Sequence, residues 1–572
     1  MGCRVPLLPR RCPTASAALL ASLAVAATPS STEATPVPRG RPGTRLWRFA
    51  VRRRWSLAFI AAVGAIAIRN LVGLSTTPSG LYADEVSIGY NAWTIAHFGV
   101  DEHGATLPLY FQAFGEWKNP VYIYALVPFV RLFGLTTAVV RTPAALFGIL
   151  TAIAMAGFAR RATGSKGVAL VTLLVAGATP WLVLQSRVAF EVPSMVACLA
   201  VMLWCLARAA LEPTRRRWFG FAGLALAFSV YAYTVGRLEG ALLAAAVVLC
   251  FSGWRLLRRL DLFIVALLAA YLLLALWAMR HPGQLTFYFN SISIAAGHPP
   301  LWTVAARFAG NMAAYFGPGF LLVSGDPNLR QSTGFGGELL VATLPLLVAG
   351  IVVCVRRWRE PLPRFVLIGL VLAPIAAALT NEGTPHALRD ATALPFWIAI
   401  TAYGIDGLRP LLRRRAAWRA VAIALAVAVA AETALFSVDL FGGYTTRSAI
   451  WFGGPEMAAI SRAHAIAGDH TVWLSSELKQ PYIYACFVAL PPPPDHAVGG
   501  ASVDIELAEA GFREISGSSA ASPVRDGDLL VLGARETPPP GSVPIFTESE
   551  PEMPGSVSGV TAVVAVRVWR AG

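Results

Sequence analysis

Long apolar segments alternate with short polar ones from Trp55 to about residue 436. A helix needs roughly 17–25 predominantly apolar residues to cross a lipid bilayer, and eleven segments approach that length. These segments are 55–74, 138–159, 167–185, 192–211, 218–235, 238–254, 262–279, 338–354, 364–380, 391–408 and 418–436. The pattern therefore predicts an all-α polytopic membrane protein with about 11 transmembrane helices.

The composition supports this prediction. Of the 572 residues, 56% are hydrophobic and 14% are charged, whereas a soluble globular protein has roughly 45–50% and about 25%. The net charge is +15, but it lies in short clusters between the apolar segments. A protein that binds nucleic acid would concentrate its basic residues on one folded face. The distribution therefore argues against a nucleic-acid partner.

The basic clusters also predict an orientation, because Arg and Lys are enriched in cytoplasmic loops. They lie at alternate boundaries of the apolar segments: Arg52–Arg54, Arg160–Lys166, Arg208–Arg217, Arg255–Arg259, Arg356–Arg359 and Arg409–Arg415. This places the loops 75–137 and 280–337 on the outer face of the cytoplasmic membrane. The agreement requires Asn119–Gly134, which is short and contains two prolines, to be an interfacial helix on the outer face.

The two ends of the chain differ in charge. Residues 1–54 hold ten Arg and one acidic residue, and we expect a disordered cytoplasmic tail. The apolar stretch Ala17–Ala27 resembles a signal-peptide core, but its cleavage would reverse the orientation. Residues 437–572 hold eight basic and fifteen acidic residues. Their pattern predicts a small extracytoplasmic α/β domain with a helix at Pro455–Ala467 and strands at Thr471–Leu474, Leu529–Leu532 and Val560–Trp569.

Candidate chemistry gathers in the segments assigned to the outer face. Asp84 and Glu85 follow the first apolar segment and precede an amphipathic run, Val86–Phe98, which we expect to lie on the membrane surface. A carboxylate held there could take a proton from a hydroxyl. Glu191 follows the third apolar segment and could face Asp84 across a cavity. The alternative for Asp84 is a solvated loop residue, and the alternative for Glu191 is a helix-end ion pair with Arg187.

Other polar residues on that face could bind a substrate. Arginine matches phosphate oxygens with its planar fork, and arginines on the outer face run against the usual charge bias. The candidates for binding are Asp101, Glu102, His103, Lys118, Arg141, Arg187, Tyr233, Arg237, Arg330, His386 and Arg389. The seven cysteines show no metal-ligand spacing, and no histidine pair is spaced i, i+4, so a metal site is neither indicated nor excluded.

Many short motifs occur in an order that resembles the bacterial dolichyl-phosphate-mannose protein mannosyltransferase family, which is related to the lipid A aminoarabinose transferases and has the C-type glycosyltransferase fold. The matching segments are Tyr82–Glu85, Gly99–Gly104, Leu107–Phe111, Phe114–Tyr124, Phe133–Leu135, Arg141–Leu146, Ser186–Glu191, Tyr231–Arg237, Gly325–Arg330 and Pro385–Arg389. The resemblance covers about residues 55–410. Two positions depart from the family pattern: Asn119 stands where Pro is common, and Glu191 stands where many relatives have Asp.

The resemblance implies an enzyme that moves a hexose or pentose, with inversion, from a polyprenyl-phosphate carrier to an acceptor hydroxyl on protein, lipid or glycan. It implies that Asp84 is the general base, that Glu85 supports it or links to a metal, and that Glu191 orients the acceptor or a cation. Arg187, Arg237 and Arg389 are then candidates for the carrier phosphate. No cofactor is firmly implied beyond, at most, a divalent cation.

Two other functions stay open from the sequence. A polytopic transporter or lipid flippase would also have many spans, but it would place ionisable residues near span centres. The predicted span centres here are almost free of acids. A catalytically inactive relative that scaffolds envelope assembly is a third interpretation, against which the intact Asp84 argues.

Overall fold

A computed structural model describes residues 42–212, 214–251, 260–414, 416–493, 508, 510–515, 524–533, 536–549 and 565–571, with side chains from Arg54 on except at 412–415, 549 and 565. Within these residues, seven helices are long and apolar enough to cross a membrane. They correspond to α1 (Pro42–Leu71), α4 (Thr137–Thr163), α7 (Val192–Leu211), α10 (Asp261–Arg280), α14 with α15 (Pro361–Leu372, Ile375–Ala378), α16 (Leu394–Arg414) and α17 (Ala416–Phe441). The protein is thus a multi-pass membrane protein, and the expected count of eleven spans is not confirmed.

The remaining expected spans are shorter helices or broken ones. These are α5 (Lys166–Ala178), α6 (Pro180–Gln185), α8 (Arg217–Ala232), α9 (Gly236–Phe251) and α13 (Leu344–Arg356). The segment 167–185, expected as one span, is interrupted between α5 and α6 because Pro180 has no backbone N–H to continue the helix. The helix α1 begins at Pro42, so the last part of the expected N-terminal tail is helical. Residues 1–41 of that tail lie outside the described residues.

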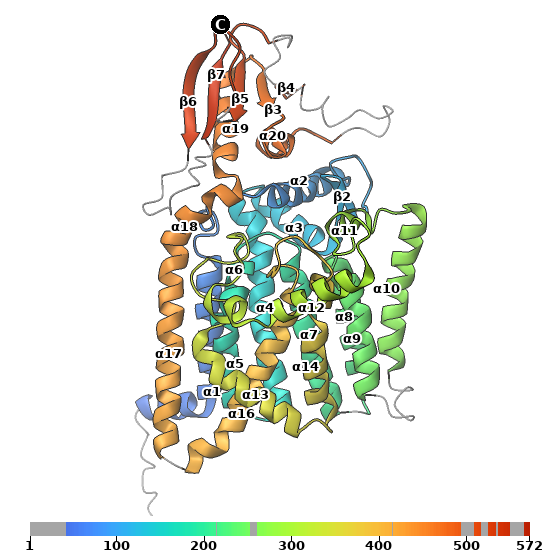
Figure 1. Cartoon of the computed structure of the whole chain (residues 1–572). Helices are drawn as coiled ribbons and strands as arrows, with labels where there is room; N and C mark the ends of the chain where they lie inside the picture. Colours follow the sequence, from blue (N-terminus) through green and yellow to red (C-terminus); the bar gives the residue numbers. More distant parts are fainter. Residues whose placement is uncertain are drawn as a thin grey trace, which may run out of the picture. The chain divides into compact units, whose positions relative to one another are not determined.

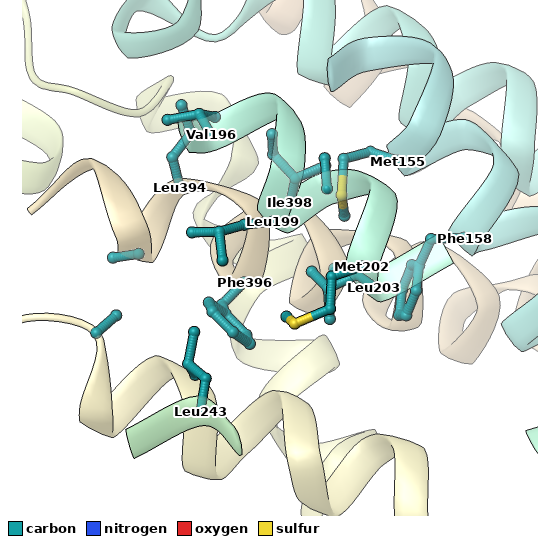
Figure 2. Packing of buried hydrophobic residues seen from close by; sticks show 14 of the residues in the cluster. Met155, Phe158, Val196, Leu199, Met202, Leu203, Leu243, Leu394, Phe396 and Ile398 are labelled. Atoms are coloured by element: carbon teal, nitrogen blue, oxygen red, sulfur yellow. The ribbon is translucent and has the colours of Figure 1, made fainter. Parts of the chain in front are cut away.

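A shared apolar core holds these helices together. Apolar side chains of α4, α7, α9 and α16 pack on one another (Figure 2). They are Met155 and Phe158 of α4, Val196, Leu199, Met202 and Leu203 of α7, Leu243 of α9, and Leu394, Phe396 and Ile398 of α16. Glycines allow close approach here, since a Cβ on Gly350 or Gly404 would lie within 2.0 Å of a backbone oxygen of the neighbouring helix. By contrast, α17 is exposed over most of its length, as expected for a helix with a lipid-facing surface.

Several short elements lie in the connecting segments (Figure 1). They are α2 (Ala83–Phe98), β1 (Phe111–Ala113), β2 (Glu116–Lys118), α3 (Pro120–Phe133), α11 (Phe287–Ile292), α12 (Leu301–Tyr315), η2 (Gly319–Val323), η3 (Val341–Thr343) and η4 (Ala391–Ala393). The helix α3 has 14 residues and coincides with the segment expected to be interfacial.

The C-terminal residues form the small α/β domain that the sequence predicts. They comprise α18 (Gly443–Ser448), η5 (Ala449–Phe452), α19 (Gly454–Ala467), β3 (Val472–Ser475), α20 (Pro481–Ala489), β4 (Phe512–Ile515), β5 (Leu529–Gly533), β6 (Val543–Ser549) and β7 (Ala565–Arg570). The strands make one sheet in the order β4-β3-β5-β7-β6, with β3 parallel to β4 and β5. The expected helix and three strands are present, although residues 560–564 lie outside the described part of the chain.

The helix α2, which carries Asp84, is buried on two sides. Ile88, Ala92 and Ile95 pack on α3 and α4, whereas Leu81, Val86 and Tyr90 belong to the apolar core of the C-terminal domain. The run Val86–Phe98 is helical as expected, as part of α2, and α20 of the C-terminal domain packs against this helix. This two-sided packing holds Asp84 at a fixed place between the helical region and the C-terminal domain.

Candidate active site

Asp84 lies in the first turn of α2, where the helix dipole stabilises a negative charge. Its Oδ1 accepts a hydrogen bond of 2.7 Å from Nζ of Lys118, and its side chain remains 32% exposed. The Lys118 side chain is only 4% exposed. Burial lowers the pKa of Lys118, but Asp84, Glu116 and Glu191 outweigh it and the pKa lies above its ordinary value. Asp84 therefore faces a permanent ammonium group while keeping access to solvent.

A tight hairpin places Lys118 at this position. The strands β1 and β2 pair so that Phe111 faces Lys118, and Phe114 and Gly115 between them both have positive φ, as in a two-residue turn. Residues two apart on a strand point to the same face. Glu116 and Lys118 accordingly both reach the same cavity.

Glu191 lies at the start of α7 and is held by one residue. The backbone N–H of Asn119 donates to its Oε1, and the Asn119 amide donates to its Oε2 at 3.1 Å. Nη2 of Arg237 in turn donates to Asn119 Oδ1 at 3.1 Å. Burial raises the pKa of Glu191 to about 7, although Lys118 and the bonds from Asn119 oppose the shift. The two positions that depart from the family pattern are thus in direct contact.

Arg389 forms an ion pair with Glu382, with 2.7 Å between Nη2 of Arg389 and Oε2 of Glu382. The same guanidinium donates to Thr380 Oγ1 at 3.2 Å and to the Glu382 carbonyl at 2.8 Å. Burial and the nearby Arg389 lower the pKa of His386 to about 3, so this imidazole is neutral. Burial also raises the pKa of Tyr233, which keeps its phenol protonated.

These side chains line one cavity of about 670 Å³. The charged residues in its wall are Asp84, Glu116, Glu191, Glu382, Lys118, Arg237, Arg330, Arg389 and Lys479. Apolar groups such as Ile88, Leu274 and Phe289 line other parts of it. The cavity can therefore accept a ligand that has both a charged head and an apolar portion.

Eight of the residues singled out from the sequence meet in this cavity, and six do not. Asp84, Lys118, Glu191, Tyr233, Arg237, Arg330, His386 and Arg389 line it, whereas Glu85, Asp101, Glu102, His103, Arg141 and Arg187 do not. Asp101 organises the loop after α2 by accepting hydrogen bonds from the N–H groups of His103 and Ala105. Glu102 is buried beside it, and burial raises its pKa to about 8.

Glu85, Arg141 and Arg187 are buried and do not line the cavity. Arg141 donates to both Glu85 oxygens at 2.8 and 2.9 Å, and to the carbonyls of Leu74, Pro78 and Gly80. Arg187 donates to the carbonyls of Arg69, Asn70, Val72 and Thr77. Both guanidinium groups thereby hold the segment between α1 and α2, and their N–H donors are taken up by protein oxygens.

The described residues do not fit a divalent cation. No group of three or more His, Cys, Asp and Glu among them could hold a metal ion. Asp84 already pairs with the Lys118 ammonium, and both Glu191 oxygens accept bonds from Asn119. We therefore derive no step through a metal.

The sequence did not single out Asn119 as a ligand, nor Glu116, Glu382, Tyr82 and Lys479, all of which contact site residues or line the cavity. Glu116 could have been found from its i, i+2 spacing to Lys118 on a strand. Lys479 gives no such signal, because only the docking of the C-terminal domain brings it to the cavity.

The chain is similar to a known protein family. Residues 118–281 match the model of the dolichyl-phosphate-mannose-protein mannosyltransferase family. The matched segment includes Lys118, Glu191 and Arg237. The resemblance to this mannosyltransferase family, read from the motifs, is confirmed. No curated protein matches the sequence of the chain.

Two solved structures share the fold. ArnT from Cupriavidus metallidurans bound to undecaprenyl phosphate is 16% identical, with a TM-score of 0.51 over 84% of this chain and 93% of that chain. The apo structure of the same protein gives a TM-score of 0.52 at 16% identity, over 85% and 94% of the two chains. This chain therefore has an ArnT-like fold.

Proposed function

We propose that the protein is an integral membrane glycosyltransferase that moves a sugar from a polyprenyl-phosphate donor to an acceptor hydroxyl, with inversion. The observation that carries the proposal is the single cavity in which Asp84 and Glu191 meet the cations Lys118, Arg237 and Arg389. The mannosyltransferase family match and the fold shared with an undecaprenyl-phosphate-bound ArnT support the donor class. The apolar part of the cavity wall suits an isoprenoid.

In the proposed reaction, Asp84 accepts the proton of the acceptor hydroxyl. The hydroxyl oxygen then bonds to the anomeric carbon of the sugar from the side opposite the carrier. The bond between that carbon and the carrier phosphate breaks, and the electron pair leaves with the phosphate. Preorganised cations stabilise such developing charge, and we assign this role to Arg237 and Arg389 of the cavity wall.

We further propose that the cavity opens on the outer face of the cytoplasmic membrane and that the C-terminal domain is extracytoplasmic. Arg141 near the start of α4 lies beside the site, whereas Arg160 and Arg161 lie at the other end of the same helix. Basic residues mark the cytoplasmic ends of transmembrane helices. The cavity is therefore assigned to the opposite side.

The test is sugar transfer by Asp84→Asn in membrane vesicles supplied with radiolabelled undecaprenyl-phosphate sugars. General base catalysis contributes about 10²–10⁴-fold, so we expect a loss of at least about 10²-fold. Glu360→Gln, in an exposed i, i+3 pair with Arg357, is the matched control and should transfer normally. Wild-type transfer by Asp84→Asn would overturn the mechanism, and movement of the lipid without transfer by the wild type would favour a flippase.

A further inference from the structure

Three cations in the cavity wall lack a carboxylate partner. Lys118 pairs with Asp84, and Arg389 pairs with Glu382. Arg237, Arg330 and Lys479 form no ion pair with any residue that the structure describes. Cations in a cavity wall that are not neutralised by a carboxylate attract an anion.

Two of these cations meet on one aromatic ring. The Arg330 guanidinium carbon lies 4.1 Å from the ring centroid of Tyr82, and Lys479 Nζ lies 4.7 Å from the same centroid. Lys479 Nζ also donates to the Tyr82 hydroxyl at 2.7 Å. Because the two centroid distances add to 8.8 Å, the two charges are no farther apart than that. An anion beside Tyr82 would relieve their repulsion.

The position of Arg330 is set by its own loop. Asn328 Oδ1 accepts hydrogen bonds from the Arg330 backbone N–H at 3.0 Å and from Nε at 3.3 Å. Asp326 in turn accepts a bond from the Asn328 N–H at 2.8 Å. The two terminal nitrogens of Arg330 make no hydrogen bond within the described part of the chain, which leaves a free fork at the cavity wall.

Lys479 comes from the C-terminal domain, in the connection between β3 and α20. The domain is tied to the segment of Asp84 by hydrogen bonds from the Tyr484 hydroxyl to the Leu81 carbonyl, at 3.1 Å, and from the Tyr90 hydroxyl to the Pro491 carbonyl, at 2.7 Å. A Cβ on Gly80 would lie 2.7 Å from the nitrogen of Gly454, so the two backbones are in direct contact. These contacts fix where Lys479 enters the cavity.

We propose that Lys479 and Arg330 form an anion subsite beside Tyr82, which binds a phosphate-type oxyanion of a substrate and which the C-terminal domain completes. The subsite rests on the proposed function, because its anion is either the carrier phosphate or an anionic group of the acceptor. It uses side chains other than those of the Asn119–Arg237 contact and the Arg389–Glu382 pair. The C-terminal domain thus takes part in substrate binding.

The experiment measures binding to the full-length protein in detergent, by tryptophan fluorescence, with undecaprenyl phosphate and with inorganic phosphate as probes. Inorganic phosphate is titrated both alone and in the presence of saturating undecaprenyl phosphate. The variants are Lys479→Met and Arg330→Met, with Lys479→Arg as the charge-preserving variant. Arg462→Met is the control, since Arg462 lies in the same domain and pairs with Glu548.

We expect at least fivefold weaker binding of a probe by Lys479→Met and Arg330→Met, wild-type affinity for the control, and near wild-type affinity for Lys479→Arg. Weaker binding of undecaprenyl phosphate assigns the subsite to the carrier. Unchanged binding of undecaprenyl phosphate with weaker binding of inorganic phosphate in its presence assigns it to the acceptor. Wild-type affinity of both Met variants for both probes would overturn the subsite.

These outcomes are separable from the fate of the proposed function. If the wild type does not bind undecaprenyl phosphate, the proposed donor is wrong, whereas the phosphate titration still tests the cations. If the Met variants bind both probes normally while Asp84→Asn abolishes transfer, the subsite is wrong and the transferase proposal stands.

Discussion

The buried pair of Glu85 and Arg141 should determine the stability of the site. Both side chains are fully buried, and their shortest contact is 2.8 Å. Glu85 also accepts the backbone N–H groups of Tyr82, at 3.1 Å, and of Ala189, at 2.8 Å. The Glu85 carboxylate therefore links α2, α4 and Ala189, which lies shortly before α7.

The expected cost of Glu85→Ala follows from these contacts. Removing one partner of a buried ion pair costs about 3–5 kcal/mol, because the other charge stays buried. Two backbone N–H groups also lose their acceptor, at about 1–3 kcal/mol for each buried donor left unsatisfied. The three carbonyls that contact Arg141 offset part of this loss. We expect a decrease of at least about 4 kcal/mol in the free energy of unfolding.

The assay is equilibrium unfolding in mixed micelles titrated with SDS, followed by tryptophan fluorescence. The matched control is Glu360→Ala, which breaks an exposed pair with Arg357 and should cost at most about 1 kcal/mol. If Glu85→Ala were as stable as this control, the structural account of the pair would be refuted. If Glu85→Gln kept wild-type stability and lost sugar transfer, Glu85 would be catalytic rather than positioning.

Three further outcomes test the site. Asn119→Pro removes the N–H and the side-chain amide that hold Glu191, and the Asn119 φ of −83° is one that proline tolerates. We expect Asn119→Pro to lower kcat/KM in vesicles by about 10–100-fold, and Asn119→Ala to lower it less. Equal kcat/KM values for the two variants would show that the contact is irrelevant. Because burial raises the pKa of Glu191 from 4.5 to about 7, its contribution to stability is greatest below pH 4.5 and falls as the pH rises to 7. The free energy of unfolding, measured in SDS at several pH values, should therefore decrease over this pH range in the wild type and not in Glu191→Gln. Transfer should persist in excess EDTA, since Lys118 already neutralises Asp84, and complete loss restored by a divalent cation would contradict this.

The site residues show which predictions were within reach of the sequence. Asp84 could be identified from the sequence because it is a carboxylate that follows an apolar segment and lies within a family motif. Arg187 was equally conspicuous, yet its donors are taken up by four carbonyls of the segment 69–77. A sequence lists charges but does not show which of them already have partners. Asn119 was noticed only as a departure, because its contact with Glu191 joins positions 72 residues apart.

Membrane insertion was determined by the sequence alone, because apolar segment length and loop charge act locally and need no tertiary contact. The elements of the C-terminal domain were predictable in part for the same reason, from short-range patterns at Pro455–Ala467 and Leu529–Leu532. Only the tertiary structure decided that α2 is covered on two sides, and that Lys479 reaches Tyr82 across 397 positions of the chain. Such contacts depend on how separate elements pack, and packing is a property of the folded chain rather than of any segment of it.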